Sequence, residues 1–499
     1  MAPQEHYRKS DSHAQQADDS YAPPEHKKEC NDVFFLLVFL ALVGTTLYFA
    51  GAYGSDFVDA TQVQGLAEDS GFRVMLKLIG TSAAAAMGMS LVWIGIMIVA
   101  GELLIWVALI AIIALNIAAA YFLTKQAYDR GSDYYYWPAI VFGLTALLLV
   151  LYTCCIRKRI KFAAAHLKVA GHAVFRLPMT LVVALVMVVV HVGWCFAWIV
   201  GTVGIMFKQD YVQLDDLCTQ QKCDVKTKTG AVLGVLFGML VIFFWGSFVL
   251  KNIIAVTTSG TVAAWKNASN SAFITVGAWI RAMTLNLGSI CFGSLIVAIL
   301  EATRTILNIL SSLASESGNC AAACAFACLA CLIGCIESWI EFFNRFAYTY
   351  VGCYGYSFIT ASKHVFKLFK SKGWSAIVND DLTNNVFFLG NVIIGAVTAY
   401  IAVKMMPQQG TPDYEKIAMF EHPTAVVGFF AFVVGYATNN LFMSVIASAV
   451  TTVFVLWAED PHGWQMTRPD AYQSLHSAWL EIYPEEYNNG YGKQVDNSV

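Results

Sequence analysis

Charged residues are scarce in this chain. Only 13% of its 499 residues are Asp, Glu, Lys or Arg, whereas a soluble domain carries about 25%. The net charge of −3 shows no basic excess of the kind that nucleic-acid-binding proteins carry. Proline and glycine, at 11 and 36 residues, are too few for a fibrous or low-complexity chain. Hydrophobic residues make up 58%, more than soluble packing can bury, so the composition predicts a polytopic membrane protein.

The motifs of soluble enzymes are also missing. The sequence contains no Walker loop, no dinucleotide-binding fingerprint, no HExxH and no nucleophile elbow. We therefore expect no enzymatic activity, no metal, no cofactor, no nucleotide and no nucleic-acid partner. The expected partners are the lipid bilayer and a small solute, and the sequence leaves the oligomeric state open.

Ten stretches are long and apolar enough to span a membrane, which takes about 20 residues for ~30 Å of hydrocarbon. They lie at 33–53, 79–101, 103–124, 139–155, 179–206, 231–256, 284–310, 320–343, 386–406 and 424–457. Glu102 alone separates the second from the third, so we expect a tight hairpin there. The stretches predict an all-α transmembrane domain over 33–457, between a disordered tail at 1–32 and a C-terminal tail at 458–499 that could dock on the cytosolic face.

The distribution of Lys and Arg predicts the orientation of these helices. With the N-terminus inside, the inner segments hold 18 of these residues and the outer segments nine. The densest group, Arg157–Lys161, directly follows a span. We therefore expect both termini in the cytosol. Cys218 and Cys223 then lie in an outer loop, where oxidation is permitted, and we predict a disulfide between them.

Five charged residues lie in the seventh span and along the eighth helix, which continues apolar and aromatic past residue 343. A charge at membrane depth is costly unless it is paired or functional. Glu301 and Arg304 are three residues apart on one helix face and able to pair. Glu337, Glu341 and Arg345 share one arc of the next helix. Two interpretations stay open for these residues: ion pairs that fix helix packing, or charged gate groups along a solute pathway.

Smaller polar residues in the spans suggest helix packing. Five cysteines between Cys320 and Cys335 fall on one narrow face, separated mainly by Ala. Small residues are typical of close helix contacts, whereas a zinc site usually gathers ligands from two elements. We therefore predict that this cysteine stripe packs against another helix. Four asparagines are expected to form hydrogen bonds between helices: Asn116, Asn391, Asn439 and Asn440.

An aromatic group lies near mid-membrane. His191, Trp194 and Trp198 share one face of the fifth span, and Trp245 lies midway along the sixth. Trp is usually found at the membrane interface instead. Aromatic faces attract a quaternary ammonium by about 2 kcal/mol or more when desolvated. These four residues are either a buried aromatic core or, as our hypothesis for substrate contact, a site for an organic cation.

The seventh and eighth spans resemble those of a known family. Arg281-Ala-Met, the stretch NLGSICFGSLIVAILE at 286–301, the cysteine-rich helix, NRFAY at 344–348 and ASK at 361–363 follow in its order and spacing. Gly260-Thr261 and Trp265 match upstream. The chain resembles the choline transporter-like family, in particular its fungal pH-nine-sensitive branch, over roughly 250–400. The short segment 54–77 differs from the long cysteine-rich loop of many animal members.

The resemblance implies a ten-helix protein of the plasma membrane, with both termini cytosolic, that moves choline or a related small organic cation. Two alternatives stay open: a non-transporting membrane scaffold or lipid-handling protein, and a transporter of a different small solute.

Overall fold

The computed structural model describes residues 29–61, 70–131, 136–208, 212–214, 225–227, 229–267, 273–407, 411 and 423–484. Helices make up nearly all of this part, and the predicted all-α polytopic membrane fold is confirmed. One pair of short antiparallel strands, β1 (Val212–Leu214) and β2 (Val225–Thr227), lies between the fifth and sixth predicted spans. Cys218 and Cys223, the predicted disulfide, lie outside the described residues.

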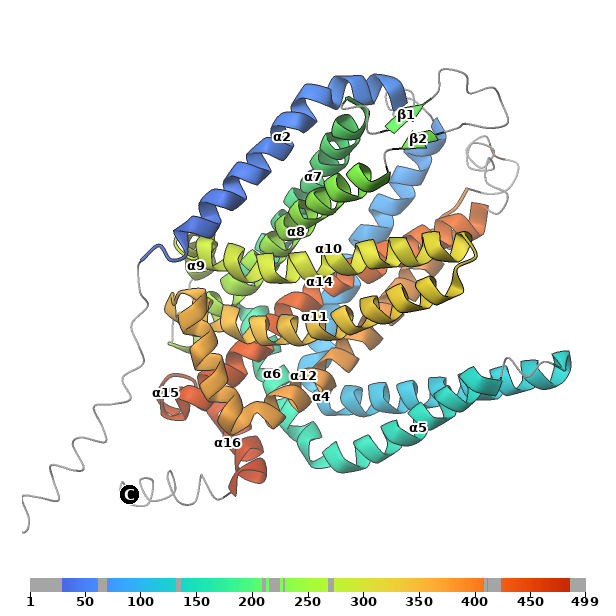
Figure 1. Cartoon of the computed structure of the whole chain (residues 1–499). Coiled ribbons are helices and arrows are strands. Elements are labelled where there is room, and N and C mark those ends of the chain that lie inside the picture. Colours follow the sequence, from blue (N-terminus) through green and yellow to red (C-terminus); the bar gives the residue numbers. More distant parts are fainter. Residues whose placement is uncertain are drawn as a thin grey trace, which may run out of the picture.

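Each predicted span overlaps one of the long helices (Figure 1). In chain order the helices are α2 (Val33–Thr61), α4 (Ser70–Arg130), α5 (Tyr136–Ile156), the single turn η2 (Arg157–Arg159), α6 (Ile160–Arg176), α7 (Met179–Lys208), α8 (Thr229–Lys266), α9 (Phe273–Met283), α10 (Leu287–Glu316), α11 (Cys320–Tyr354), α12 (Phe358–Lys404), α14 (Pro423–Glu459), α15 (Pro461–Thr467) and α16 (Pro469–Ile482).

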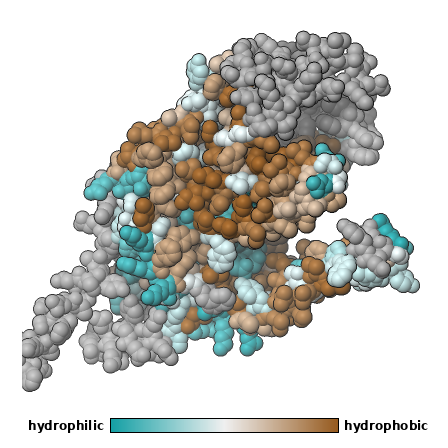
Figure 2. All heavy atoms as spheres, in the orientation of Figure 1, coloured by the Kyte–Doolittle hydropathy of each residue, from teal (hydrophilic) through white to brown (hydrophobic). Residues whose placement is uncertain are grey.

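Large hydrophobic side chains face outward along the helices. Figure 2 shows them over the middle of the molecule, while hydrophilic side chains gather toward the end that carries α9, α15 and α16 in Figure 1. Val99 and Trp137, for example, are 89% and 74% exposed. Exposure of so much apolar surface to water would be costly, whereas contact with hydrocarbon is not. The outer surface is therefore that of a protein embedded in lipid.

Helix α4 is too long for a single crossing. Its 61 residues extend about 90 Å at 1.5 Å per residue, against roughly 30 Å of hydrocarbon. The backbone leaves helical geometry at Ala100, with φ −122° and ψ 27°, and the second half turns away toward α5 (Figure 1). This break lies two residues before Glu102, where the sequence predicts a hairpin. Nine described helices are long and apolar enough to cross a membrane, and we count α4 as two crossings.

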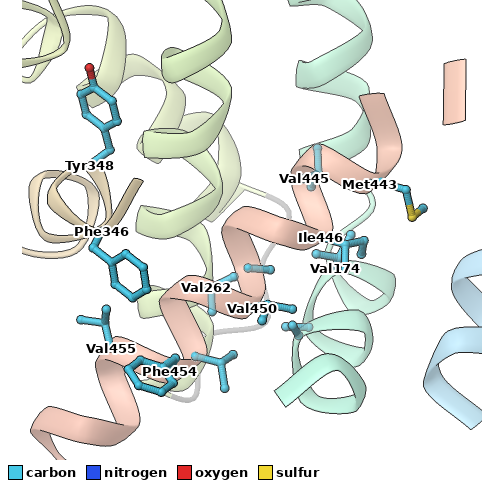
Figure 3. Close-up of a cluster of buried hydrophobic side chains, with 14 of the residues drawn as sticks. Val174, Val262, Phe346, Tyr348, Met443, Val445, Ile446, Val450, Phe454 and Val455 are labelled. Atoms are coloured by element: carbon cyan, nitrogen blue, oxygen red, sulfur yellow. The ribbon is translucent and has the colours of Figure 1, made fainter. Parts of the chain in front are cut away.

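Helix α14 runs through the middle of the bundle. In its most apolar stretch 78% of the residues are buried, more than in the other described spans. Figure 3 shows its side chains packed among those of neighbouring helices, with Val174 of α6, Val262 of α8 and Phe346 of α11 around them. The helix is continuous from Pro423 to Glu459, so the asparagines at its centre do not break it.

Three asparagines join α14 to α12, as the sequence predicts. Asn439 Nδ2 donates to Asn391 Oδ1 at 2.7 Å, and Asn391 Nδ2 donates to Asn440 Oδ1 at 3.1 Å. Asn439 is fully buried, and a buried amide is costly unless it is hydrogen-bonded. Asn116 differs from the prediction, because its amide donates to the Ile112 carbonyl within α4.

Helices α8 and α11 approach each other closely at two glycines. A Cβ atom on Gly352 would lie 2.6 Å from the Val256 carbonyl oxygen and 2.9 Å from Ser259 Cβ. A Cβ atom on Gly260 would lie 3.0 Å from the Gly352 carbonyl oxygen. Small residues allow such backbone contact between membrane helices. The two glycines therefore fix the spacing between α8 and α11.

The segment after α14 docks on the bundle. Trp464 of α15 and Trp479 of α16 are buried. Trp479 Nε1 donates to His166 Nε2 at 3.2 Å, and His166 Nδ1 donates to the Phe162 carbonyl at 2.8 Å. These roles require a neutral imidazole that carries its proton on Nδ1. The described part of the C-terminal segment is thus an integral layer of the fold.

An ion pair beside α15 makes stability depend on pH. Asp460 Oδ2 accepts from Lys266 Nζ at 2.7 Å, and Asp460 Oδ1 accepts from the Gly463 amide at 2.9 Å. Burial raises the pKa of the Asp460 carboxyl, but these hydrogen bonds and the Lys266 charge outweigh it and hold the pKa below its usual value. Such a group contributes stability above about pH 4, and the contribution is lost as the pH falls through the folded-state pKa.

We expect Asp460→Asn to lower the free energy of unfolding at pH 7 by about 1–2 kcal/mol, because a charged hydrogen bond is lost. The difference from wild type should shrink at pH 3.5, below the ordinary carboxyl pKa of about 3.9, because the unfolded wild-type chain then binds a proton that the folded chain binds less readily. Thermal unfolding of both proteins in detergent at the two pH values measures this. A difference of equal size at both pH values would contradict the role of the carboxylate.

Candidate solute-binding cavity

Five helices (α8, α10, α11, α12 and α14) line a cavity of about 360 Å³. Sites for small molecules span roughly 300–1,000 Å³. Aromatic rings contribute much of its wall: Phe248, Tyr348, Phe387, Phe388 and Tyr436. Lys251 and Asn440 also line it and are exposed, so the cavity is open on one side. The cavity combines aromatic faces with polar groups and an opening.

Glu341 is the one carboxylate among the described residues that line the cavity. Lys251 Nζ lies 3.3 Å from Glu341 Oε1 and 5.6 Å from the centre of the Phe248 ring. A carboxylate and an aromatic face together are what attracts an organic cation. The lysine ammonium therefore marks a position in this cavity where a positive charge is stabilised.

The other cation of the cavity, Arg345, has a different carboxylate partner. Its guanidinium forms an ion pair with Asp380 of α12. The neighbouring Asp381 accepts a hydrogen bond of 2.7 Å from the Tyr152 hydroxyl of α5. Because Arg345 is neutralised by Asp380, Lys251 is the ion-pair partner of Glu341. The Lys251 side chain is 60% exposed, and ion pairs of exposed groups are weak.

Hydrogen bonds to α10 fix uncharged polar side chains that line the cavity. Asn252 Nδ2 donates to Ser294 Oγ at 2.9 Å, and Ser294 Oγ lies 3.2 Å from the Tyr348 hydroxyl. Asn344 Nδ2 donates to the Gly293 carbonyl at 3.2 Å. Ser294 and Gly293 belong to the stretch 286–301 that carries the family resemblance. That stretch therefore forms the support behind the cavity.

The predicted pair of Glu301 and Arg304 is present in α10. Arg304 also reaches across to α11, where its Nε lies 3.2 Å from Glu337 Oε2. Two carboxylates thus share one guanidinium at the contact between the two helices. None of the three lines the cavity. The sequence placed Glu337 and Glu341 on one arc of the helix. In the structure Glu337 belongs to this cluster, whereas Glu341 lines the cavity.

None of the four residues of the predicted aromatic site lines the cavity. Trp194 and Trp198 of α7 donate to the carbonyls of Phe243 and Met239 in α8, at 3.2 and 2.7 Å. Trp245 donates to the Cys291 carbonyl of α10 at 2.9 Å and is buried. His191 lies on the same helix as the first two and is half-buried. The indole N–H groups of the three tryptophans therefore join neighbouring helices.

The cysteine stripe of α11 does not pack inside the chain as predicted. All five cysteines between Cys320 and Cys335 are exposed. The sequence pattern revealed one narrow face but not which way it points, and this face points outward. Among the described residues, no three His, Cys, Asp or Glu side chains are placed to hold a metal ion together.

The sequence indicated some of the cavity and missed the rest. Glu341 and Arg345 stood out as charges at membrane depth. Nothing in the sequence indicated that Lys251 pairs with Glu341. Phe248 and Tyr436 gave no signal, because aromatic residues are common on every span. Only the packing of α8 against α11 and α14 brings these side chains together.

The chain is similar to known membrane proteins. A model of the family described as plasma-membrane choline transporter matches residues 140–462, which include all five helices of the cavity. The chain is 30% identical over 461 residues to Protein PNS1 of Mycosarcoma maydis, covering 90% of this chain and 82% of that protein. It is 30% identical to Protein PNS1 of Debaryomyces hansenii and 27% identical to that of Saccharomyces cerevisiae. These two matches each cover 70% of this chain, and 67% and 65% of the relatives.

Proposed function

This chain belongs to the plasma-membrane choline transporter family, and we propose that it moves choline or a related small organic cation across the plasma membrane. The cavity of α8, α10, α11, α12 and α14 is the proposed binding site. The main support for this site is the position of the Lys251 ammonium, which lies 3.3 Å from the Glu341 carboxylate and 5.6 Å from the centre of the Phe248 ring. An aromatic face attracts a quaternary ammonium in the same way, and a carboxylate attracts it through its opposite charge.

In the proposed mechanism the substrate and Lys251 compete for Glu341. An entering cation displaces the lysine ammonium, so the carboxylate keeps a positive partner at every stage and is never left unpaired. Lys251 can leave because it is exposed and its side chain is long. Release of the substrate restores the ion pair. Alternating access and facilitated diffusion are both compatible with this exchange.

Equilibrium binding of radiolabelled choline to the purified protein tests the proposal. We expect saturable binding that tetramethylammonium displaces, because it carries the same charged head. The uncharged isostere 3,3-dimethyl-1-butanol should displace choline at least tenfold less well, since it has the shape without the charge. Equal displacement by both compounds, or no saturable binding, would contradict a cation site.

Most substitutions in a binding site weaken binding, but replacing Lys251 is expected to strengthen it. We expect Lys251→Gln to strengthen choline binding several-fold, because the competing ammonium is removed and Glu341 keeps its charge. The same binding measurement checks this. Lys404→Gln, which changes an exposed lysine at the end of α12, serves as the matched control. Weaker binding by Lys251→Gln would show that Lys251 assists the substrate rather than competes with it.

The aromatic group of α7 and α8 is the second candidate for substrate contact. Half-buried Trp198 is the most informative member, because the indole N–H holds the Met239 carbonyl while part of the ring stays accessible. If the ring contacts choline, Trp198→Ala weakens binding and Glu341→Gln does not. If the ring only packs α7 against α8, Trp198→Ala lowers thermal stability and leaves the dissociation constant unchanged.

A further inference from the structure

A second cavity lies away from the proposed choline site, where α6 meets α15 and α16. Its volume is about 580 Å³. Figure 1 shows α15 and α16 at the same end of the molecule as α6, and α16 packs on α6. Arg176, the last residue of α6, lies three residues before Met179, where the membrane-spanning α7 begins. The cavity is therefore at the level where lipid headgroups meet the cytosol.

Three cationic side chains, Lys168, Arg176 and Arg468, line this cavity together with His172, whose Nε2 accepts from Arg176 Nε at 3.5 Å. We call these four residues the basic pocket. Asp470 is the one carboxylate among the described lining residues. Positive charge is therefore in excess around this cavity, and it comes from two segments nearly 300 residues apart in sequence. Like charges gathered in one place repel each other, and an anion bound between them would relieve that repulsion.

Arg468 is held rigidly within the basic pocket. Its Nε and Nη2 atoms donate to the Trp265 carbonyl at 3.0 and 2.8 Å, and the guanidinium lies 4.6 Å from the centre of the Trp265 ring. Burial, and then the neighbouring Arg176 charge, lower the pKa of Arg468. These contacts fix the Arg468 guanidinium in the lining of the basic pocket, beside the charge of Arg176.

We propose that the basic pocket binds a phosphate group, contributed either by an anionic lipid headgroup or by a soluble phosphate compound. Arginine and lysine are the usual donors to phosphate, and charge-assisted hydrogen bonds to it are strong. A bound phosphate would join α6 to α16 and so hold the C-terminal segment on the bundle. The residues that line the basic pocket are not among those that line the choline cavity.

Binding measurements on the full-length protein in nanodiscs test this proposal. The probes are pyrophosphate with phosphatidylcholine nanodiscs, and nanodiscs that contain 10% phosphatidylinositol 4-phosphate, with thermal stabilisation as the readout. We expect saturable stabilisation by at least one probe. Stabilisation by pyrophosphate in neutral lipid identifies a soluble ligand, and stabilisation by the phosphoinositide alone identifies a headgroup.

Variants separate the basic pocket from general surface charge. The double variant Lys168→Gln/Arg176→Gln should bind the effective probe at least tenfold more weakly, and Lys367→Gln, an exposed basic residue of α12, should bind like wild type. If the double variant fails to fold, Lys168→Gln alone should weaken binding about threefold. Wild-type affinity in these pocket variants, or no saturable stabilisation of wild type by either probe, would overturn the proposal.

Discussion

Glu341→Gln is expected to reduce the kcat/KM of choline uptake by about tenfold to a hundredfold. The substitution keeps the shape of the side chain and removes its charge, so an organic cation loses its carboxylate partner. A hydrogen bond or contact that involves a charged group is worth about 1.5–3 kcal/mol, and 1.4 kcal/mol corresponds to tenfold. Uptake of radiolabelled choline by proteoliposomes with equal amounts of wild type and variant measures the effect.

Glu316→Gln provides the matched control for this prediction. Glu316 is an exposed carboxylate at the end of α10, outside the cavity. The same chemical change should leave kcat/KM within about twofold of wild type, because surface charges contribute little. Equal losses in both variants would indicate a general effect of negative charge on cation uptake. Full activity of Glu341→Gln would exclude the cavity carboxylate as a substrate contact.

Gly352→Val is expected to have the largest effect on stability. The new side chain would begin 2.6 Å from the Val256 carbonyl oxygen, a backbone atom that cannot move without displacing α8. Overpacking costs about 1–3 kcal/mol even where side chains can adjust, and here two backbones must separate. We expect the yield of monodisperse protein to fall several-fold. Because α8 carries Lys251 and α11 carries Glu341, the surviving protein should also bind choline more weakly.

Gly238→Val distinguishes this clash from the general effect of a branched residue. Gly238 also lies in α8, and a Cβ atom there would meet nothing within 4 Å. We expect near-wild-type yield, measured by fluorescence-detected size-exclusion chromatography. Equal losses for Gly238→Val and Gly352→Val would mean that the helix itself, and not its contact with α11, is sensitive to substitution.

Hydrophobicity alone was enough to predict the fold class. A span of about 20 apolar residues has few alternatives in a membrane, since backbone groups must be satisfied within the helix. The same physics predicted the break between the second and third spans. It also placed Glu301 and Arg304 within reach of each other, because residues three apart share a helix face. These successes concern single helices, where spacing along the chain decides geometry.

Contacts between helices were harder to predict. The exposed cysteines of α11 illustrate the reason: small residues favour close packing, but periodicity does not say whether a partner helix lies on that side. Trp194 and Trp198 illustrate a second reason. An indole ring can bind a cation or donate its N–H to a backbone carbonyl, and only the position of α8 shows that these two donate. The cavity around Glu341 depends on five helices, so no local pattern contained it.

Uptake of radiolabelled choline into liposomes that contain the purified protein tests the central proposal most directly. It is measured with and without a pH gradient, beside liposomes that contain no protein and liposomes that contain Glu341→Gln. Wild-type protein should give saturable uptake, and the variant should give at most about a tenth of it. Wild-type uptake no greater than that of empty liposomes, under conditions where another choline transporter works, would contradict transport of choline and favour a different solute or a scaffold.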